Sequence, residues 1–340
     1  MTLLDPATQP DAIERAAQRL ADGGLLALPT ETVYGLGARA DDDAAVARIF
    51  AAKGRPSDHP LIVHVPNPQA ALHFVSAFPP VAQRLTQAFW PGPLTVIVPR
   101  DPRVATAAAG GHDTIGLRCP SHPVAQRLLD ACAQQGILGV AAPSANRFGR
   151  ISPTTAQHVS EEFDGRGTDL DEVWVLDGGA CDVGIESTIV DCTRGAPVLL
   201  RPGAITRDQI QAACGLRLQG DAAALAALGE APRASGTLEA HYAPAAKVRL
   251  MDAKALQTSL DLLGAEAAHI AVYARTPLRL LSSQVLLRRM PDDAQATAQQ
   301  LFSVLRDFDA QGVKLIWVEL VPATAEWDGV RDRLQRAAAA

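Results

Sequence analysis

The amino-acid sequence predicts an α/β protein of two domains, the first built on a mixed twisted sheet and the second on a smaller, doubly wound parallel sheet. The chain has 340 residues, and about 150 residues per domain implies two globular units. Short apolar runs alternate with helical patterns, as they do in α/β folds. A stretch rich in Gly, Ala and Pro, from 217 to 244, interrupts this alternation and indicates a linker. The predicted boundaries are therefore 1–215, then 216–246 for the linker, then 247–340.

The first domain starts with a helical pattern over residues 11–22, which stops at Gly23-Gly24 and is followed by an apolar strand at 25–28. Residues 30–37 are too rich in glycine and hydroxyl groups for a core segment and are predicted to be a loop. A helix capped by Asp41–Asp43 runs through Ala52 and leads into a polar loop. Strands are expected at 61–65, 94–98, 114–119, 138–142, 173–176, 188–191 and 198–200. Because several of them follow one another without a helix, the sheet is predicted to be mixed.

The second domain shows the simpler alternation of strands and helices. Apolar runs at 248–251, 270–273, 285–287 and 315–318 are separated by helical stretches such as 294–308. This order predicts a parallel sheet with helices on both faces. Few of its residues have catalytic chemistry, so the sequence assigns it no role beyond that of an accessory domain.

Composition and charge narrow the class of protein. The chain is 48% hydrophobic and 20% charged, which is typical of a soluble globular protein. No apolar run reaches the roughly 18 residues of a membrane span, and residues 1–9 do not resemble a signal peptide, so a cytoplasmic location is expected. The five cysteines are widely spaced without any C-x-x-C pair and are predicted to be buried fillers. A net charge of −6 disfavours broad binding to nucleic acid.

One glycine motif admits two interpretations. Gly35-Leu36-Gly37-Ala38-Arg39-Ala40 matches G-x-G-x-x-A, the fingerprint of a dinucleotide site, but the acidic residue expected after the second strand is missing. The favoured interpretation is a tight turn that uses the glycines. No Walker-type phosphate loop, no G-x-S-x-G motif and no metal-ligand spacing of histidines occurs in the sequence.

Two polar loops are candidates for binding phosphate groups. The loop 53–60 contains Lys53, Arg55 and His59, which suit charge-assisted bonds to phosphates, although an ordinary solvated helix terminus is an equal alternative. Pro143-Ser144-Ala145-Asn146 follows an apolar strand and could place hydroxyl and amide groups around a ligand, or form only a capping turn. Further along, Ser187 and Arg201 are predicted to lie at the ends of two elements that could be neighbours; either residue could also be structural, with Arg201 as a buried ion-pair partner.

The order of the motifs resembles that of the YrdC-like threonylcarbamoyl-AMP synthase family. The resemblance begins with PTETVYGLG at 29–37 and KGRP at 53–56, and continues with PLIVH at 60–64 and WPGPLT at 90–95. It extends through TIGLR at 114–118, APSAN at 142–146, ESTI at 186–189 and LRPG at 200–203. HYAP at 241–244, followed by a further α/β domain, is similar to the long form of the family. The chain departs from many long-form relatives at 234–238, where ASGTL replaces a Ser-Pro-Gly-Met type stretch.

This resemblance implies an enzyme that combines L-threonine, bicarbonate or CO2 and ATP into threonylcarbamoyl-AMP and pyrophosphate, with Mg2+ accompanying ATP. The product would be passed to a tRNA threonylcarbamoyl-transferase complex for modification of adenosine 37 of tRNA. Implied threonine-binding residues are Thr32, His64, Arg118, Ala142 and Ser187. Implied nucleotide-binding residues are Lys53, Arg55, His59, Thr114, Ser144, Asn146, Ser152, Arg201 and Tyr242, with Lys53 and Arg55 in catalytic roles.

Two rival functions remain open at this point. YrdC-like folds have been linked with double-stranded RNA binding, so weak RNA binding is an alternative that the acidic charge balance disfavours. Related domains also process carbamoyl adenylates in larger hydrogenase-maturation proteins, but the zinc-finger and acylphosphatase-like segments of those proteins are not found in this sequence. No residue stands out as the base that deprotonates threonine.

Overall fold

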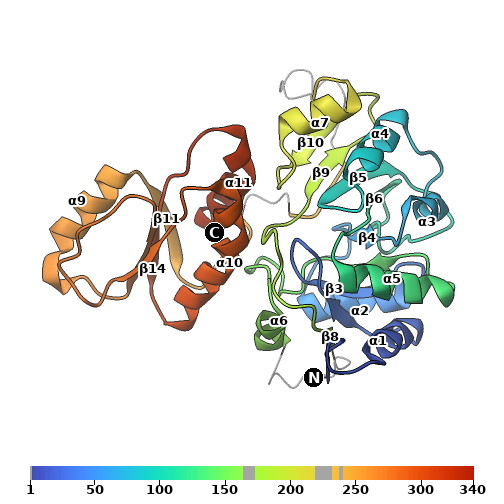
Figure 1. Cartoon of the computed structure of the whole chain (residues 1–340), viewed down its shortest axis with the longest axis horizontal. Helices are drawn as coiled ribbons and strands as arrows, with labels where there is room; N and C mark the ends of the chain where they lie inside the picture. Colours follow the sequence, from blue (N-terminus) through green and yellow to red (C-terminus); the bar gives the residue numbers. More distant parts are fainter. Residues whose placement is uncertain (1, 164–172, 219–231, 237–239) are drawn as a thin grey trace. The chain divides into compact units, whose positions relative to one another are not determined.

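The computed structural model describes residues 2–163, 173–218, 232–236 and 240–340. The chain forms two compact units, of which the first comprises 1–148 and 153–237 and the second comprises 149–152 and 238–340. The division at 237/238 falls inside the predicted linker. The short segment 149–152 groups with the second unit, although the sequence prediction includes it in the first domain. Each unit is a layered α/β structure (Figure 1).

The first unit is built on a mixed sheet in the strand order β1-β8-β2-β3-β7-β4-β6-β5-β9-β10. The sheet contains parallel pairs such as β4 with β6 and antiparallel pairs such as β5 with β6, which confirms the mixed sheet predicted from the sequence. The strands are β1 (Thr2–Leu4), β2 (Leu26–Leu28), β3 (Gly35–Arg39), β4 (Ile62–His64), β5 (Leu94–Pro99), β6 (Thr114–Arg118), β7 (Val140–Ala141), β8 (Trp174–Leu176), β9 (Thr188–Asp191) and β10 (Val198–Arg201).

Helices cover both faces of this sheet. Because successive strand residues point to opposite faces, Leu26 and Leu28 of β2 pack into one core while Ala27 packs into the other. The core around Leu26 contains α1 (Ala12–Ala21) and α5 (Pro123–Gln134). The opposite core contains α2 (Asp43–Lys53), α3 (Pro68–Ala71), α4 (Pro80–Phe89), α6 (Ala156–Phe163) and α7 (Arg207–Cys214).

The segment predicted to be a loop at 30–37 is partly a central strand. Gly35–Arg39 forms β3, which pairs antiparallel with β2 and β7, so both the dinucleotide fingerprint and the tight-turn interpretation were wrong. The glycines are explained by packing: a Cβ atom on Gly37 would lie 2.8 Å from Leu28 Cδ2 and 2.8 Å from Val140 Cγ1. Such distances are too short for carbon atoms, so glycine here allows close packing between neighbouring strands.

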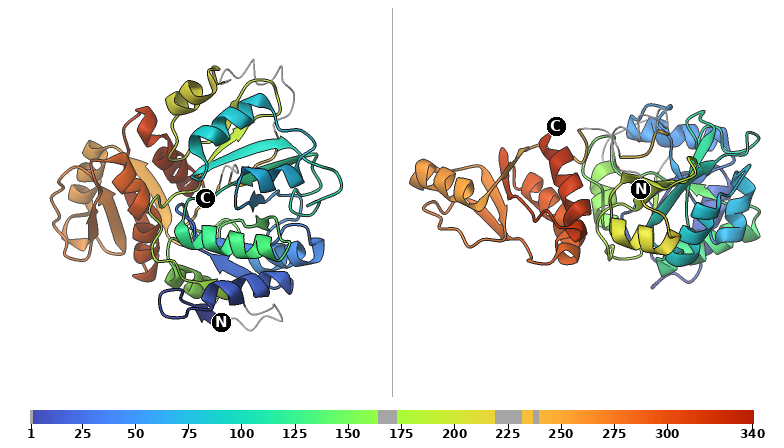
Figure 2. Two further views of the ribbon diagram at one scale, coloured as in Figure 1. Left: turned by 45° about the vertical axis from the view of Figure 1, so that its right-hand side comes forward. Right: turned by 90° about the horizontal axis from the view of Figure 1, so that it is seen from above.

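The second unit contains a parallel sheet in the order β11-β14-β12-β13. Helix α9 covers one face, and α10 and α11 cover the other, which confirms the predicted doubly wound arrangement (Figures 1 and 2). The strands are β11 (Lys247–Met251), β12 (Ile270–Ala274), β13 (Leu286–Arg289) and β14 (Leu315–Glu319). The helices are α9 (Ala253–Leu263), α10 (Ala294–Ala310) and α11 (Asp328–Ala338).

The five cysteines are free thiols buried in the first unit, as predicted. Burial raises the pKa of Cys132 to about 12, which keeps that thiol protonated and unreactive at neutral pH. Within the described residues, no helix combines the length and the hydropathy that crossing a membrane requires.

Candidate functional site

The strand residues predicted to bind ligands share one face of the first unit's sheet. His64 of β4 lies beside Arg118 of β6 in the parallel pair, and beside Val140 of β7 in the antiparallel pair. Val140 packs with α1 and α5, so His64 and Arg118 lie on the face that these helices cover. Ala142 follows β7 on the same face, where it packs in the same core. The sheet register thus brings together three of the five residues predicted to bind threonine.

Arg118 is the buried cation of this group, with a side chain only 4% exposed. Its Nη1 donates to Thr32 Oγ1 at 2.8 Å, and its Nε donates to the carbonyl of Gly92 at 3.4 Å. Glu31 Oε1 lies 2.8 Å from Arg118 Nη2, forming a buried ion pair that the sequence prediction did not include. Arg118 and Thr32 therefore meet as predicted, but beside an unexpected carboxylate.

His64 is a neutral histidine in this site. Burial, with a smaller contribution from the charge of Arg118, lowers the pKa of His64 to about 3. A neutral imidazole has one nitrogen that accepts a hydrogen bond and one that donates. Among the described residues, its Nδ1 makes no hydrogen bond with good geometry.

Lys53 holds two of the candidate loops together. Helix α2 ends at Gly54, which adopts a left-handed conformation with φ of 62°, so Lys53 is the last helical residue. Its Nζ donates to the carbonyl of Ser144 at 2.5 Å and to the carbonyl of Asn146. The side chain is buried, and burial lowers the pKa of Lys53 well below its ordinary value. The interpretation of Lys53 as part of a solvated helix terminus was therefore wrong.

Arg55 lies near the same loop. Its Nη2 donates to the carbonyl of Pro60 at 3.1 Å and to Ser235 Oγ at 3.2 Å, while its guanidinium stacks over the ring of Phe148 at 5.5 Å. His59 packs edge-on against the same ring, with the ring centres 5.5 Å apart. Burial lowers the pKa of His59, and the positive charge of Arg55 adds to that effect.

Arg201 connects the two predicted groups of residues. Its Nε donates to the carbonyl of Ser187 at 3.0 Å, and its Nη2 lies 3.1 Å from Ser187 Oγ. Ser187 Oγ also lies 2.7 Å from Thr95 Oγ1. The remaining nitrogen, Nη1, donates to the carbonyl of Ser235 at 2.8 Å. Ser187, which is predicted to bind threonine, is thus hydrogen-bonded to Arg201, which is predicted to bind the nucleotide.

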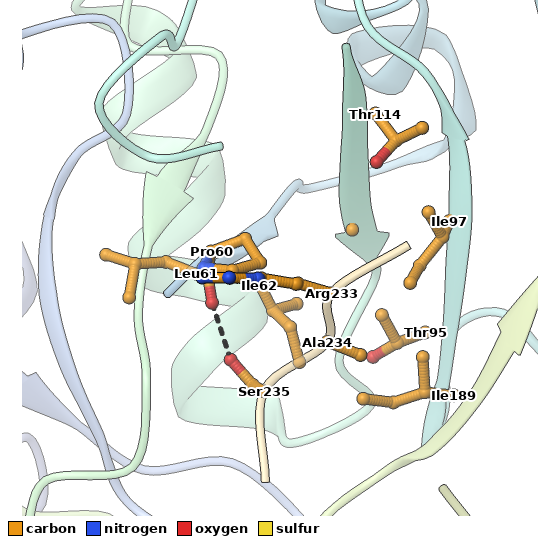
Figure 3. Close-up of a pocket in the computed structure, with 11 residues that line it drawn as sticks. Pro60, Leu61, Ile62, Thr95, Ile97, Thr114, Ile189, Arg233, Ala234 and Ser235 are labelled. Carbon is orange, nitrogen blue, oxygen red and sulfur yellow. Dashed lines mark hydrogen bonds between the residues drawn. The ribbon is translucent and has the colours of Figure 1, made fainter. Parts of the chain in front are cut away.

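An apolar pocket adjoins these polar groups on the sheet. Ile62, Ile97 and Ile189 form a small buried cluster against which Ala234 packs. Thr114 and Thr95 add hydroxyl groups to the lining, and Ser235 Oγ donates to the carbonyl of Pro60 at 2.8 Å (Figure 3). The segment 233–235 passes over the strands in Figure 3, so part of the linker region lies against the pocket.

The predicted site residues do not all belong to one unit. Ser152 and Tyr242 are part of the second unit. Tyr242 is buried there with φ of 61°, its ring 5.5 Å from that of Phe302 and 5.5 Å beneath the guanidinium of Arg333. Asn146 is buried in the first unit, where its Nδ2 donates to the carbonyl of Arg147 at 2.7 Å.

Sequence reasoning missed three residues that contact the predicted ones. Glu31 lies inside the motif 29–37, and Thr95 ends the motif 90–95, so both could have been noticed as polar residues next to assigned ones. Ser235 gave no such signal, because its contacts with Arg55 and Arg201 depend on the path of the chain. Across the described ranges, no group of three or more His, Cys, Asp or Glu side chains could hold a metal ion.

Known proteins match both parts of this architecture. The family described as "Telomere recombination", covering Sua5, YciO and YrdC proteins, matches residues 18–203. The family described as "Threonylcarbamoyl-AMP synthase, C-terminal domain" matches residues 205–339.

Individual relatives match over nearly the full length. The chain is 35% identical to the threonylcarbamoyl-AMP synthase of Pyrococcus abyssi, over 96% of this chain and 93% of the relative. Identity to the threonylcarbamoyl-AMP synthase of Bacillus subtilis is 36%, over 97% of this chain and 94% of the relative. The crystal structure of P. abyssi Sua5 complexed with L-threonine, 34% identical, superposes with a TM-score of 0.85 over 99% of this chain and 97% of that chain.

Proposed function

Because this chain belongs to the threonylcarbamoyl-AMP synthase family, we propose that it is a nucleotidyltransferase that makes threonylcarbamoyl-AMP and pyrophosphate from L-threonine, bicarbonate or CO2, and ATP. The observation that carries this proposal is the meeting of two guanidinium groups at one residue. Arg55 and Arg201, from distant parts of the chain, both hydrogen bond to Ser235. Two cations held this close together match the charge of a triphosphate.

In this proposal the two groups of side chains have different tasks. Arg118 and Thr32 bind polar groups of threonine, with Arg118 pairing with its carboxylate. Arg55 and Arg201 neutralise the phosphates and the charge that develops when the threonine carbamate attacks the α-phosphorus and pyrophosphate leaves. The hydrogen bonds from Arg201 to Ser187 support a shared site, since they join the two groups.

Lys53 contributes through the loop that it holds. Its Nζ donates to the carbonyls of Ser144 and Asn146, so it fixes the position of this loop beside the proposed nucleotide site. The apolar cluster of Ile62, Ile97 and Ile189, against which Ala234 packs, has the apolar surface that an adenine base needs. We propose that Mg2+ enters with ATP, bound mainly by phosphate oxygens, as is usual for this ion. The adenylate would then be consumed by a transferase that modifies tRNA.

The test is product formation by the purified full-length protein. ATP, Mg2+ and bicarbonate are supplied with L-threonine, with L-serine or without amino acid, and both pyrophosphate and the mass of the adenylate are measured. We expect an adenylate with the mass of threonylcarbamoyl-AMP only when L-threonine is present. Folded protein that binds ATP yet forms no adenylate would refute the proposal, and salt-sensitive RNA binding in that case would favour the RNA-binding alternative.

A further inference from the structure

Glu31 stands out as a buried carboxylate at the centre of the predicted threonine site. It lies between β2 and β3, and its side chain is only 6% exposed. The backbone N–H of Ser121 donates to its Oε2 at 3.1 Å, which fixes one side of the carboxylate. Its other oxygen, Oε1, lies 2.8 Å from Arg118 Nη2.

Three buried polar atoms in this cluster lack hydrogen-bond partners. Glu31 Oε1 and Arg118 Nη2 are close enough for an ion pair, yet among the described residues neither atom has a partner with hydrogen-bond geometry. The third is Nδ1 of His64, which lies beside Arg118 in the strand register. Within the part of the chain that the structure describes, Glu31 and Arg118 thus form an ion pair whose facing atoms make no well-oriented hydrogen bond, and the imidazole of His64 adds a third buried polar group beside them. Because buried polar groups in folded proteins usually complete their hydrogen bonds, this cluster indicates a place where a polar ligand binds.

The charges of the cluster match those of an α-amino acid. Arg118 donates hydrogen bonds and suits a carboxylate, whereas Glu31 accepts them and suits an ammonium group. In an α-amino acid one carbon atom separates these two charged groups, so their binding residues must be neighbours, as the 2.8 Å between Glu31 Oε1 and Arg118 Nη2 makes them.

We propose that Glu31 binds the α-ammonium group of L-threonine while Arg118 binds its carboxylate, an inference that rests on the proposed function. Glu31 thereby selects amino acids over hydroxy acids of the same shape. It also places the nitrogen that becomes the carbamate at a defined position next to Arg118. The competing role, in which Glu31 only orients Arg118, predicts a different response to substrate analogues.

The experiment measures the binding of three ligands by calorimetry to the wild-type protein and to Glu31→Gln. L-threonine has both charged groups, L-threoninol has only the ammonium, and 2,3-dihydroxybutyrate has only the carboxylate. A charged hydrogen bond contributes about 1.5–3 kcal/mol. We therefore expect Glu31→Gln to weaken the binding of L-threonine and of L-threoninol by roughly 10- to 100-fold. Binding of 2,3-dihydroxybutyrate is expected to stay within about threefold, a change of less than 1 kcal/mol.

Controls separate this proposal from its alternatives. Glu31→Asp keeps the charge and should recover part of the affinity for L-threonine, while Glu319→Gln alters a buried carboxylate of the second unit and should change no ligand affinity. ATP binding and the melting temperature of the Glu31 variants show that their fold is intact, whereas Glu319→Gln is expected to melt at a lower temperature and still bind ATP. If Glu31→Gln weakens the binding of L-threonine and of dihydroxybutyrate equally and leaves the binding of L-threoninol unchanged, Glu31 only orients Arg118. Unchanged L-threonine binding in Glu31→Gln also overturns the proposal. Wild-type protein that binds L-threonine but forms no adenylate contradicts the proposed function alone.

Discussion

Each unit contains a buried glutamate paired with an arginine, and the two pairs differ in how completely they are hydrogen-bonded. In the second unit, Glu319 accepts from the backbone N–H groups of Arg275 and Thr276, from Thr276 Oγ1 and from Arg275 Nη2. Both its oxygens are used, so this carboxylate joins the ends of β12 and β14. Glu31 of the first unit has one oxygen without a hydrogen-bond partner among the described residues. A saturated carboxylate stabilises a fold, whereas an unsaturated one is available to a ligand.

The same difference extends to the surrounding sheet face. In the first unit, the face that α1 and α5 partly cover continues into polar side chains such as His64, Thr95 and Arg118. In the second unit, the core between the sheet and α9 is apolar, with Val272 and Trp317 of the strands in one cluster with Leu256 of the helix. The comparison predicts that replacing a buried polar residue of the first unit mainly changes the enzyme kinetics. Replacing a buried polar residue of the second unit should mainly change the free energy of unfolding.

The largest expected effect is that of Arg201→Ala. This change removes the hydrogen bonds to the carbonyl and Oγ of Ser187 and to the carbonyl of Ser235. It also removes a cation that is proposed to bind phosphate. Loss of one such transition-state contact costs about 3–4 kcal/mol, so we expect kcat/KM for ATP to fall by roughly 100- to 1000-fold. Steady-state kinetics with pyrophosphate detection measures this. Arg279→Ala, at an exposed ion pair of the second unit, is the matched control and should retain wild-type kinetics. A kcat/KM for ATP within threefold of wild type in Arg201→Ala contradicts the assignment.

Glu319→Gln is expected to produce the largest loss of stability without a kinetic effect. The amide nitrogen of glutamine cannot accept the hydrogen bonds that both carboxylate oxygens now accept from residues 275 and 276. We expect the free energy of unfolding of the second unit to fall by about 2–3 kcal/mol, as for other buried hydrogen bonds to charged groups. Urea unfolding followed by tryptophan fluorescence measures the change, since Trp317 lies in that unit. A variant with wild-type stability but altered L-threonine affinity contradicts the comparison.

His64 predicts a dependence of stability on pH in the first unit. Its pKa is lowered to about 3 in the folded protein, below the ordinary 6.5, so the unfolded chain binds a proton more readily. Stability is therefore full above pH 6.5 and is lost as the pH falls toward 3. Between pH 6.5 and 5, this group alone should lower the free energy of unfolding by about 1.6 kcal/mol. Urea unfolding of wild type and His64→Gln at both pH values tests this; equal pH dependence in the two proteins shows that His64 is not responsible.

The smallest expected effects come from a matched pair of changes from hydroxyl to methyl. Thr95→Val removes the contact with Ser187, and Thr276→Val removes one hydrogen bond to Glu319. Each bond contributes about 1 kcal/mol, so we expect a roughly fivefold rise in KM for L-threonine in the first variant. The second variant should lose about 1 kcal/mol of stability with normal kinetics. If the two variants exchange these effects, the division of tasks between the two units is wrong.

Much of the fold was predictable because it depends on local patterns. The apolar run at 94–98 became β5, and the helical pattern at 294–308 became α10 (Ala294–Ala310), since hydrophobic periodicity reports directly on strands and helices. The prediction failed at Gly35–Arg39, where glycine and hydroxyl content suggested a loop. Position 37 is glycine because its neighbours Leu28 and Val140 leave no room for a Cβ atom, so a residue that suggested a turn belongs to a closely packed strand.

The site shows the same division between local and long-range information. Motifs such as KGRP at 53–56 and TIGLR at 114–118 identified which residues carry chemistry, because the resemblance lies in the residues themselves. They did not show that Lys53 reaches the carbonyls of Ser144 and Asn146, or that Glu31 lies against Arg118. Those contacts join residues about 90 positions apart, and such distances in sequence leave no local pattern.

The sequence by itself determined the division into two α/β units, the family and most of the residues that bear charge in the site. Those features follow from composition, periodicity and ordered motifs, each of which is a property of neighbouring residues. Only the tertiary structure decided that Ser235 meets both Arg55 and Arg201, that Ser152 belongs with the second unit, and that Glu31 lies against Arg118. The physical reason is that sheet register and burial set which side chains meet, and both depend on the whole chain.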